Sequence, residues 1–147
     1  GDATALARMA ASVAGLCRDA GSQLIINSAL PGARELAHAL QAGVHLTSRD
    51  LATEHEDWDG LPLAASCHDA DELARAEARG AQFVVLGPVQ PTASHPQATP
   101  LGWEGFARLR ESSSLPIYAL GGLEPAQLPT ARRHGAQGIA GISGFLA

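Results

Sequence analysis

Two adjacent glycines, Gly121 and Gly122, carry the first signal of chemistry in this sequence. They follow an apolar segment, residues 115–120, that reads as a buried strand, and a helix is expected to begin at residues 123–125 with proline in its first turn. Because glycine has no Cβ, backbone N–H groups in such a turn can approach a ligand oxygen closely. With the positive end of the helix dipole they would form an anion pocket. A glycine pair that merely closes a turn is the alternative that this motif leaves open.

Small or polar residues also end other expected strands, among them Asn27, Ser66 and Gly87. In parallel α/β sheets, ligands bind at the carboxyl ends of the strands. His68 lies two positions after Ser66, and an imidazole with an unperturbed pKa of ~6.5 can both take and give a proton near neutrality. A histidine that only closes the turn before a helix capped by Asp69 is an equally open interpretation.

Composition excludes several classes of chemistry. The 147 residues carry a formal net charge of −5, and all ten Lys-or-Arg cations are arginine. Without lysine there is no Schiff base, P-loop lysine or lysine general base. An acidic balance without basic runs argues against nucleic-acid binding, and no apolar run reaches the ~20 residues of a membrane helix. No signal peptide is visible, and Cys17 and Cys67, far apart and outside any metal-ligand spacing, predict reduced thiols in a cytoplasmic protein.

Six short apolar segments alternate with segments of helical periodicity, which predicts parallel βα units. The expected strands are 23–27, 44–47, 61–66, 82–89, 115–120 and 137–143, and the expected helices are 2–20, 31–40, 69–80, 102–112 and 125–134. Six strands suit an open doubly wound sheet, whereas a closed barrel of this class needs eight. Periodicity alone does not choose between them.

The order of the motifs resembles the thiamine-phosphate synthase family and its thiazole-tautomerase relatives. Four stretches between residues 24 and 143 carry the resemblance: residues 24–27; residues 42–46 followed by Asp50; residues 87–89 with 91–94; and residues 119–122 with a final strand at 138–139 reaching Ser143. The wording of residues 87–96 is most similar to the synthase-like module that follows a Nudix hydrolase domain in certain bacterial fusion proteins. The resemblance implies an α/β fold, a (β/α)8 TIM barrel lacking its first two strands, in one domain over residues 1–147.

In that family the barrel couples hydroxymethylpyrimidine diphosphate to a thiazole phosphate, with Mg2+ on the diphosphate. Asp50 falls on a family metal position, and its alternative is a solvated or helix-capping aspartate. The resemblance also implies substrate or phosphate binding by Asn27, Ser66, Thr92, Ser94, Gly121, Gly122 and Ser143, and catalytic roles for His68 and His95.

Three departures from the family pattern weaken the expectation of catalysis. The aspartate expected after Asn27 is Ser28, and the lysine expected after Ser94 is His95. The family's glutamine, arginine and lysine cluster of the second strand is absent from this chain. Whether the protein is an enzyme therefore stays open between a weak synthase-like transferase, a thiazole tautomerase, and a non-catalytic module that senses a phosphorylated thiamine precursor for a Nudix domain.

The expected partners are small phosphorylated thiamine precursors, without nucleic acid or membrane. Six strands leave two unpaired edges, and exposed strand edges are templates for association. We therefore expect either an upstream segment that completes the barrel or a homo-oligomer.

Overall fold

The computed structural model describes residues 3–53, 57–58 and 60–146. Its strands are β1 (Ile25–Asn27), β2 (Gly43–Leu46), β3 (Leu63–Cys67), β4 (Phe83–Leu86), β5 (Ile117–Leu120) and β6 (Gly138–Ala140). Its α-helices are α1 (Ala3–Asp19), α2 (Ala33–Leu40), α3 (Ser48–Leu51), α4 (Ala70–Ala78), α5 (Gly102–Glu111) and α6 (Leu128–Arg133), with 3-10 turns η1 (Pro125–Gln127) and η2 (Ser143–Phe145).

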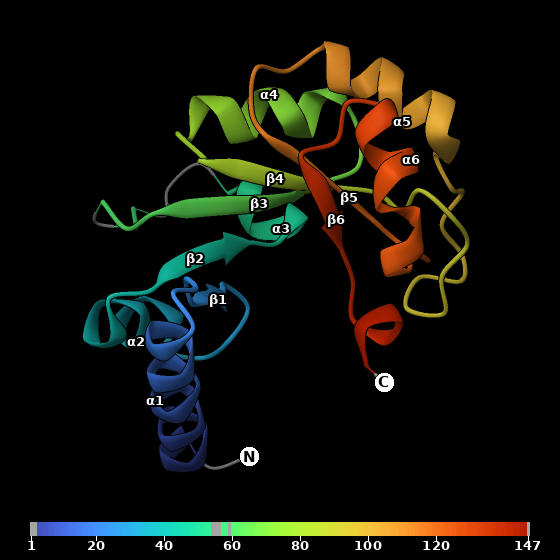
Figure 1. Cartoon of the computed structure of the whole chain (residues 1–147). Coiled ribbons are helices and arrows are strands. Elements are labelled where there is room, and N and C mark those ends of the chain that lie inside the picture. The colour runs from blue at the N-terminus through green and yellow to red at the C-terminus, as the bar shows by residue number, and fades with distance from the viewer. Residues whose placement is uncertain (1–2, 54–56, 59, 147) are drawn as a thin grey trace.

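The six strands form one parallel sheet in chain order, β1-β2-β3-β4-β5-β6. Figure 1 shows this sheet curling from β1 at one edge to β6 at the other, with α2, α4, α5 and α6 outside the curve. Connections between parallel neighbours are right-handed, so a sheet in strict chain order receives its connecting helices on one face. This arrangement is a partial barrel rather than a doubly wound sheet, as the family resemblance implied.

The hydrophobic core lies between the sheet and these helices. Alternate residues of the central strands point toward it, and Val44, Leu46, Val84, Leu86 and Ile117 are each 0% exposed. The helices supply the facing side chains, such as Leu73 of α4 and Phe106 of α5, both also buried. Burial of this kind contributes roughly 1.5–3 kcal/mol for each large aliphatic side chain and holds the sheet in its curve.

The inner face of the sheet carries the other alternate residues. The register pairs Asn27 with His45, and His45 with Ala64, whose strand neighbour on the same face is Ser66. Further along the sheet, Phe83 and Tyr118 meet edge to face with ring centroids 5.4 Å apart. Polar side chains therefore occupy the inner face near β1–β3, and aromatic ones occupy it near β4 and β5.

The elements agree with the expected ones in order, but several are shorter. The expected strand 82–89 ends at Leu86, because Gly87 and Pro88 leave the sheet. The expected helix 2–20 is α1, and Asp2 lies outside the described residues. The one-turn helix α3 was not expected; Thr47 caps it by accepting a hydrogen bond from the Asp50 N–H. None of the helices in the described ranges is long and apolar enough to cross a membrane.

Candidate functional site

A cavity of about 360 Å³ lies at the carboxyl ends of the strands. Its wall includes residues at or just after the ends of all six strands. These residues are up to 117 positions apart in sequence, from Asn27 to Gly144. Among its lining residues are all of the predicted binding and catalytic residues: Asn27, Ser66, His68, Thr92, Ser94, His95, Gly121, Gly122 and Ser143. The fold thus brings these side chains together, while their roles stay predictions. Asp50 is near this edge but does not line the cavity.

The glycine turn after β5 is held in place by the loop after β4. Gly121 and Gly122 have φ angles of 105° and 66°, which side chains other than glycine rarely adopt. A Cβ on Gly122 would lie 2.5 Å from the Pro91 carbonyl oxygen. The Val89 N–H donates to the Leu120 carbonyl at 2.8 Å. Backbone geometry alone therefore requires both glycines, with or without a ligand.

The same turn keeps its own donors available. Across the described residues, the backbone N–H groups of Gly121, Gly122, Ser143 and Gly144 have no hydrogen-bond partner. All four residues line the cavity. Unpaired N–H groups on residues that line one cavity, from two neighbouring strand ends, are the donors that an anion-binding turn uses.

The expected contribution of a helix N-terminus is wrong in part. The segment after Gly122 begins as the 3-10 turn η1, and α6 starts only at Leu128. The Glu124 N–H donates to Gln127 Oε1 at 2.9 Å, and Pro125 has no N–H. This capping box satisfies the first donors internally, so the anion surface depends on the two glycines and on residues 143–144.

Thr92, Ser94 and His95 bring hydroxyl and imidazole groups to the cavity from the loop after β4. Thr92 accepts the Ser94 N–H at 3.3 Å, and its carbonyl accepts the His95 N–H at 3.3 Å, so the loop turns tightly here. Within the described part of the chain, the Ser94 hydroxyl and the His95 ring make no hydrogen bond. These groups therefore remain available to a ligand.

His45 and Ser66 form a polar pair on the inner face of β2 and β3. His45 Nε2 lies 2.7 Å from Ser66 Oγ. Burial lowers the pKa of His45, so the ring is neutral at pH 7. A neutral ring can hold the Ser66 hydroxyl in one orientation, and Ser66 lines the cavity. His45 and Ser66 are therefore already hydrogen-bonded to each other on the inner face of the sheet.

His68 has a carboxylate and a hydroxyl beside its ring. Its Nδ1 lies 2.9 Å from Glu72 Oε2 and 3.0 Å from Ser48 Oγ. Asp69 caps α4 by accepting the Glu72 N–H at 2.9 Å, as expected. Sequence reasoning missed Glu72 and Ser48 as neighbours of His68. The Asp69-x-x-Glu72 spacing, typical of a capping box, was the signal for Glu72; no local signal identified Ser48.

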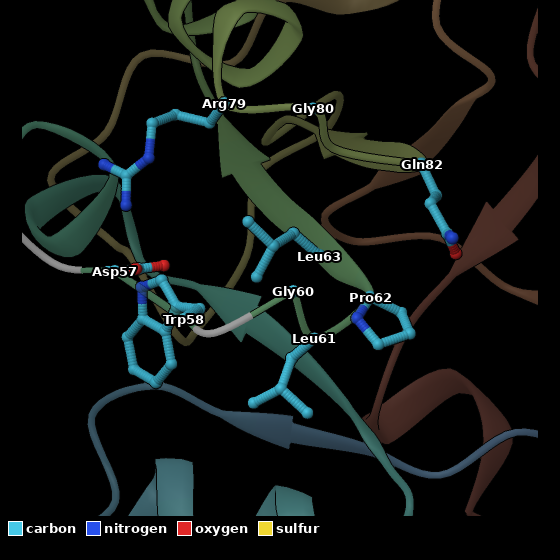
Figure 2. Close-up of a pocket in the computed structure, with 9 residues that line it drawn as sticks. All are labelled: Asp57, Trp58, Gly60, Leu61, Pro62, Leu63, Arg79, Gly80 and Gln82. Atoms are coloured by element: carbon cyan, nitrogen blue, oxygen red, sulfur yellow. The ribbon is translucent and has the colours of Figure 1, made fainter.

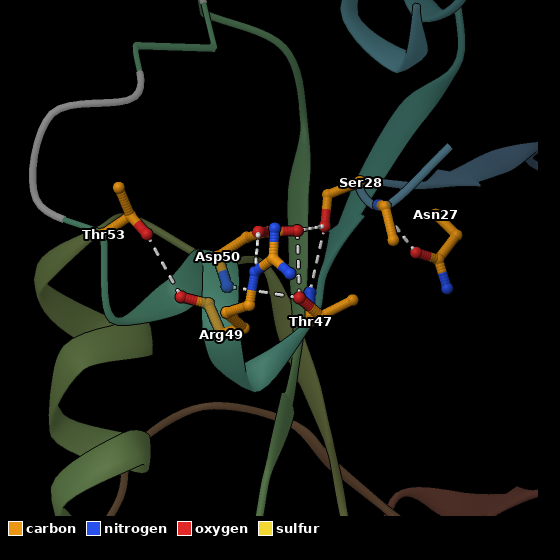
Figure 3. A network of polar contacts seen from close by, with 7 residues as sticks. Asn27, Ser28, Thr47, Arg49, Asp50 and Thr53 are labelled. Atoms are coloured by element: carbon orange, nitrogen blue, oxygen red, sulfur yellow. Dashed lines mark hydrogen bonds and ion pairs between the residues drawn. The ribbon is translucent and has the colours of Figure 1, made fainter. Parts of the chain in front are cut away.

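Asp50 is held by two hydroxyl groups from neighbouring strand ends (Figure 3). Ser28 Oγ donates to Asp50 Oδ2 at 2.5 Å, and Thr47 Oγ1 donates to the same oxygen at 2.9 Å. The hydrogen bond from Ser28 is the largest cause that lowers the pKa of Asp50. Partial burial of the carboxyl group raises the pKa, and the Thr47 hydroxyl and the charge of Arg49 lower it further. The Asp50 side chain is 15% exposed. It is therefore neither a solvated aspartate nor a helix cap.

The oxygen atoms around Asp50 fit the Mg2+ that the family resemblance implies only in part. Mg2+ takes oxygen ligands and often uses one or two carboxylates together with phosphate oxygens. Among the residues that the structure describes, no three His, Cys, Asp or Glu side chains gather in a way that could hold a metal. Asp50 Oδ2 already accepts two hydroxyl groups, so Asp50 fits Mg2+ only as a single ligand beside phosphate oxygens from a bound molecule.

A second cavity of about 410 Å³ lies at the opposite edge of the sheet, where β3 and β4 begin (Figure 2). It is lined by Asp57, Trp58, Gly60, Leu61, Pro62, Leu63, Arg79, Gly80 and Gln82. The Arg34 guanidinium lies 5.7 Å from the centre of the Trp58 ring. None of the predicted site residues lines this cavity.

Comparison with known proteins decides the family. The family model described as thiamine monophosphate synthase matches residues 1–145. The chain belongs to the thiamine-phosphate synthase family. A relative from Aquifex aeolicus, provisionally named thiamine-phosphate synthase 2, is 33% identical over 144 residues, which are 96% of this chain and 75% of the relative. The thiamine-phosphate synthase of Caldivirga maquilingensis is 32% identical over 135 residues, which are 90% of this chain and 64% of that protein.

The likeness to thiamine-phosphate synthases extends to the fold. A solved thiamine phosphate pyrophosphorylase from Pyrococcus furiosus matches with a TM-score of 0.80 at 24% identity, covering 97% of this chain and 67% of that one. This confirms the barrel-type fold that the sequence resemblance implied. Because the chain spans only part of the length of these relatives, their complete activity and substrates are proposals here.

Proposed function

We propose that this chain is a thiamine-phosphate synthase-like domain that binds thiazole phosphate and hydroxymethylpyrimidine diphosphate and couples them weakly. The observation that carries the proposal is the set of backbone N–H groups at Gly121, Gly122, Ser143 and Gly144, which have no partner among the described residues and belong to residues that line one cavity. A phosphate needs several donors in a concave site, and backbone donors supply them without a lysine.

The two sides of the cavity suit two different tasks. The glycine turn and residues 143–144 would bind the phosphate of the thiazole, and Thr92 and Ser94 would add hydroxyl donors beside it. Asn27 and Ser66, on the β1–β3 side, would orient the pyrimidine portion. Coupling then depends mainly on holding the attacking thiazole nitrogen in line with the pyrimidine methylene group, since positioning lowers the barrier by removing the freedom of two reactants.

Weak coupling follows from the charges that are present. Departure of diphosphate builds negative charge, and no lysine is available to stabilise it. His95 occupies the loop position next to Ser94 and would donate a hydrogen bond to the leaving diphosphate. Mg2+, when bound, supplies positive charge to the diphosphate oxygens, and Asp50 is the residue of this chain that would hold it.

Proton transfer to a bound thiazole is a second candidate function, and the environment of His68 favours it. Its Nδ1 lies 2.9 Å from a carboxylate, so Nε2 is the ring nitrogen left to accept a proton. Such an imidazole is suited to general acid–base catalysis. The cavity would then serve as a thiazole tautomerase.

A non-catalytic sensor of a phosphorylated thiamine precursor, attached to a Nudix hydrolase domain, would use the same phosphate surface. The synthase, tautomerase and sensor functions would all bind a phosphorylated thiamine precursor. They differ in whether the bound compound reacts and in which reaction it undergoes. The proposal also includes a cytoplasmic location, with Cys17 and Cys67 as free thiols, and association through the two sheet edges or through an upstream segment.

Calorimetry and product analysis test these functions together. The chain is titrated with thiazole phosphate and, separately, with the unphosphorylated thiazole alcohol, each with and without Mg2+. We expect binding of the phosphorylated compound only, and slow formation of thiamine phosphate after hydroxymethylpyrimidine diphosphate is added. Equal affinity for both thiazoles would show that the cavity does not recognise the phosphate group. Phosphate-dependent binding without any turnover would contradict both catalytic functions and support the non-catalytic sensor.

A further inference from the structure

His68 and Glu72 are joined at two points. His68 follows β3 and lines the cavity, and its ring Nδ1 lies 2.9 Å from Glu72 Oε2. The backbone N–H of His68 donates to the same carboxylate oxygen at 2.6 Å. Two donors from one residue on one acceptor fix both the position and the rotation of the imidazole ring.

This contact determines which ring nitrogen carries the proton. An ionised carboxylate only accepts hydrogen bonds, so the nitrogen that faces Glu72 must be Nδ1–H. Nε2 of the neutral ring is then unprotonated, and within the described residues it has no hydrogen-bond partner. The His68 side chain is 48% exposed, whereas that of Glu72 is 20% exposed. The carboxylate is thus the more buried group of the pair, and the accepting nitrogen of the more exposed ring is left for a ligand.

Helix capping does not account for the position of the Glu72 side chain. In a capping box the glutamate at the third helical position accepts the N–H of the capping residue. Here the capping residue is Asp69, but Glu72 Oε2 accepts from His68, one position earlier, at both its backbone and its ring. The carboxylate is therefore directed at the histidine.

The other two histidines near the cavity have no such partner. His45 Nε2 faces the Ser66 hydroxyl, which can either donate or accept. In the described ranges, the His95 ring makes no hydrogen bond or ion pair. A carboxylate that orients an imidazole is the arrangement found where histidine serves as a base.

We propose that Glu72 is a positioning residue that holds His68 as the Nδ1–H tautomer, so that Nε2 is the proton-accepting atom of the cavity. For the reaction, this inference rests on the proposed function, because the compound that gives up the proton is a phosphorylated heterocycle bound at the glycine turn. One proton moves from that compound to Nε2 and is returned to another atom of the same compound, and Glu72 stabilises the imidazolium formed between the two transfers.

Nitrogen NMR of the imidazole rings tests the tautomer directly. The 15N-labelled chain is observed at pH 8.5, where an ordinary imidazole is neutral, and the His68 signals are identified by their loss in His68→Gln. We expect protonated Nδ1 and bare Nε2 in the wild type, and a shift toward the Nε2–H form in Glu72→Ala. An Nε2–H tautomer in the wild type would overturn the inference even if Glu72→Ala fails to fold.

Two control variants distinguish the effect of the Glu72 carboxylate on the tautomer from the effects of neighbouring groups. Asp71→Asn removes an acid one position away in the same turn of α4, and Ser48→Ala removes the other group near Nδ1. Both are expected to keep the wild-type tautomer. If Ser48→Ala changes the tautomer as much as Glu72→Ala does, Ser48 is the positioning residue and the inference is wrong.

Exchange of deuterium from solvent into bound thiazole phosphate gives the functional readout. Glu72→Ala is expected to lower kcat for exchange by at least about tenfold with little change in KM, because the ring is still present but wrongly protonated. A wild-type chain with the expected tautomer but no exchange contradicts proton transfer as a function and leaves the positioning by Glu72 intact. An unchanged kcat in a variant with the altered tautomer contradicts the positioning role.

Discussion

Ser28 donates a hydrogen bond of 2.5 Å to the carboxylate of Asp50, from the turn after β1 to the one-turn helix after β2. The same Ser28 oxygen accepts the Thr47 N–H at 3.0 Å (Figure 3). Two adjacent strand ends are therefore tied by one hydroxyl group, at the position where the family resemblance implied an aspartate. A carboxylate there would face that of Asp50, and like charges this close need a cation between them.

Ser28→Ala should destabilise the protein in a pH-dependent way. The hydrogen bond from Ser28 lowers the pKa of Asp50, so its stabilising effect is present above the unfolded pKa of ~3.9 and is lost as pH falls through the lower folded pKa. We expect a loss of about 1.5–3 kcal/mol near pH 7 that shrinks as pH falls below the unfolded pKa, measured by urea unfolding across pH. Ser12→Ala, which removes a hydroxyl bonded to the Arg8 carbonyl in α1, should show no such pH dependence.

Gly122→Ala should abolish phosphate binding. A Cβ would lie 2.5 Å from the Pro91 carbonyl oxygen and would displace the turn. Gly102 is the matched control, because its φ of 64° resembles the 66° of Gly122 but a Cβ there meets nothing within 4 Å. Calorimetry with thiazole phosphate should show binding in Gly102→Ala and none in Gly122→Ala, with thermal melts of both to verify folding. Retained affinity in a folded Gly122→Ala would place the phosphate elsewhere.

Ser28→Asp combined with His95→Lys should raise coupling activity. Lysine would supply a permanent cation to the departing diphosphate, and one preorganised charge of this kind is worth ~3 kcal/mol, or about a hundredfold in rate. The second aspartate would add a Mg2+ ligand beside Asp50. The measurement is thiamine phosphate formed per minute with Mg2+ present. Ala98→Lys, in the same loop but outside the cavity lining, is the control for an added charge.

The coupling rate of the unmodified protein could contradict this prediction. If it already turns over at ~1 per second or faster, a rate typical of ordinary enzymes, then the lost charges do not limit coupling. Other residues would then stabilise the leaving diphosphate.

The two thiols should differ in reactivity. Burial raises the pKa of Cys67 to about 12, with further raising by the charges of Glu72 and Asp69, whereas the Cys17 side chain is half-buried. At pH 8 only about one Cys67 in ten thousand is a thiolate, and the thiolate is the reactive form. A disulfide reagent should therefore titrate one thiol in the folded protein and two in urea. Rapid reaction of both in the folded state would contradict the burial of Cys67.

The isolated chain should associate. Strands β1 and β6 each have a neighbour on one side only in the described sheet, and unpaired edges are templates for pairing. Light scattering should give a mass above the 15.1 kDa of one chain, increasing with concentration. A monodisperse monomer with cooperative unfolding would show instead that these edges are protected without a partner.

The sequence by itself determined the order of the strands and the family, and it identified nine of the residues that line the cavity. Residues such as Asn27, Ser66 and Gly121 end apolar segments, and parallel strands bring their carboxyl ends to one edge, so local pattern was enough to bring them together. The family resemblance also identified Thr92 and Ser143, because the matching motifs occur in the loops after particular strands.

Only the tertiary structure decided which polar groups are already paired. Ser28 and Asp50 are 22 positions apart, and Ser48 and His68 are 20 positions apart, so their hydrogen bonds depend on the distance between neighbouring loops. The helix expected after Gly122 begins later, because Gln127 turns back to the Glu124 N–H. Side-chain contacts of this kind follow from packing rather than from periodicity, and they determine which donors and acceptors remain for a ligand.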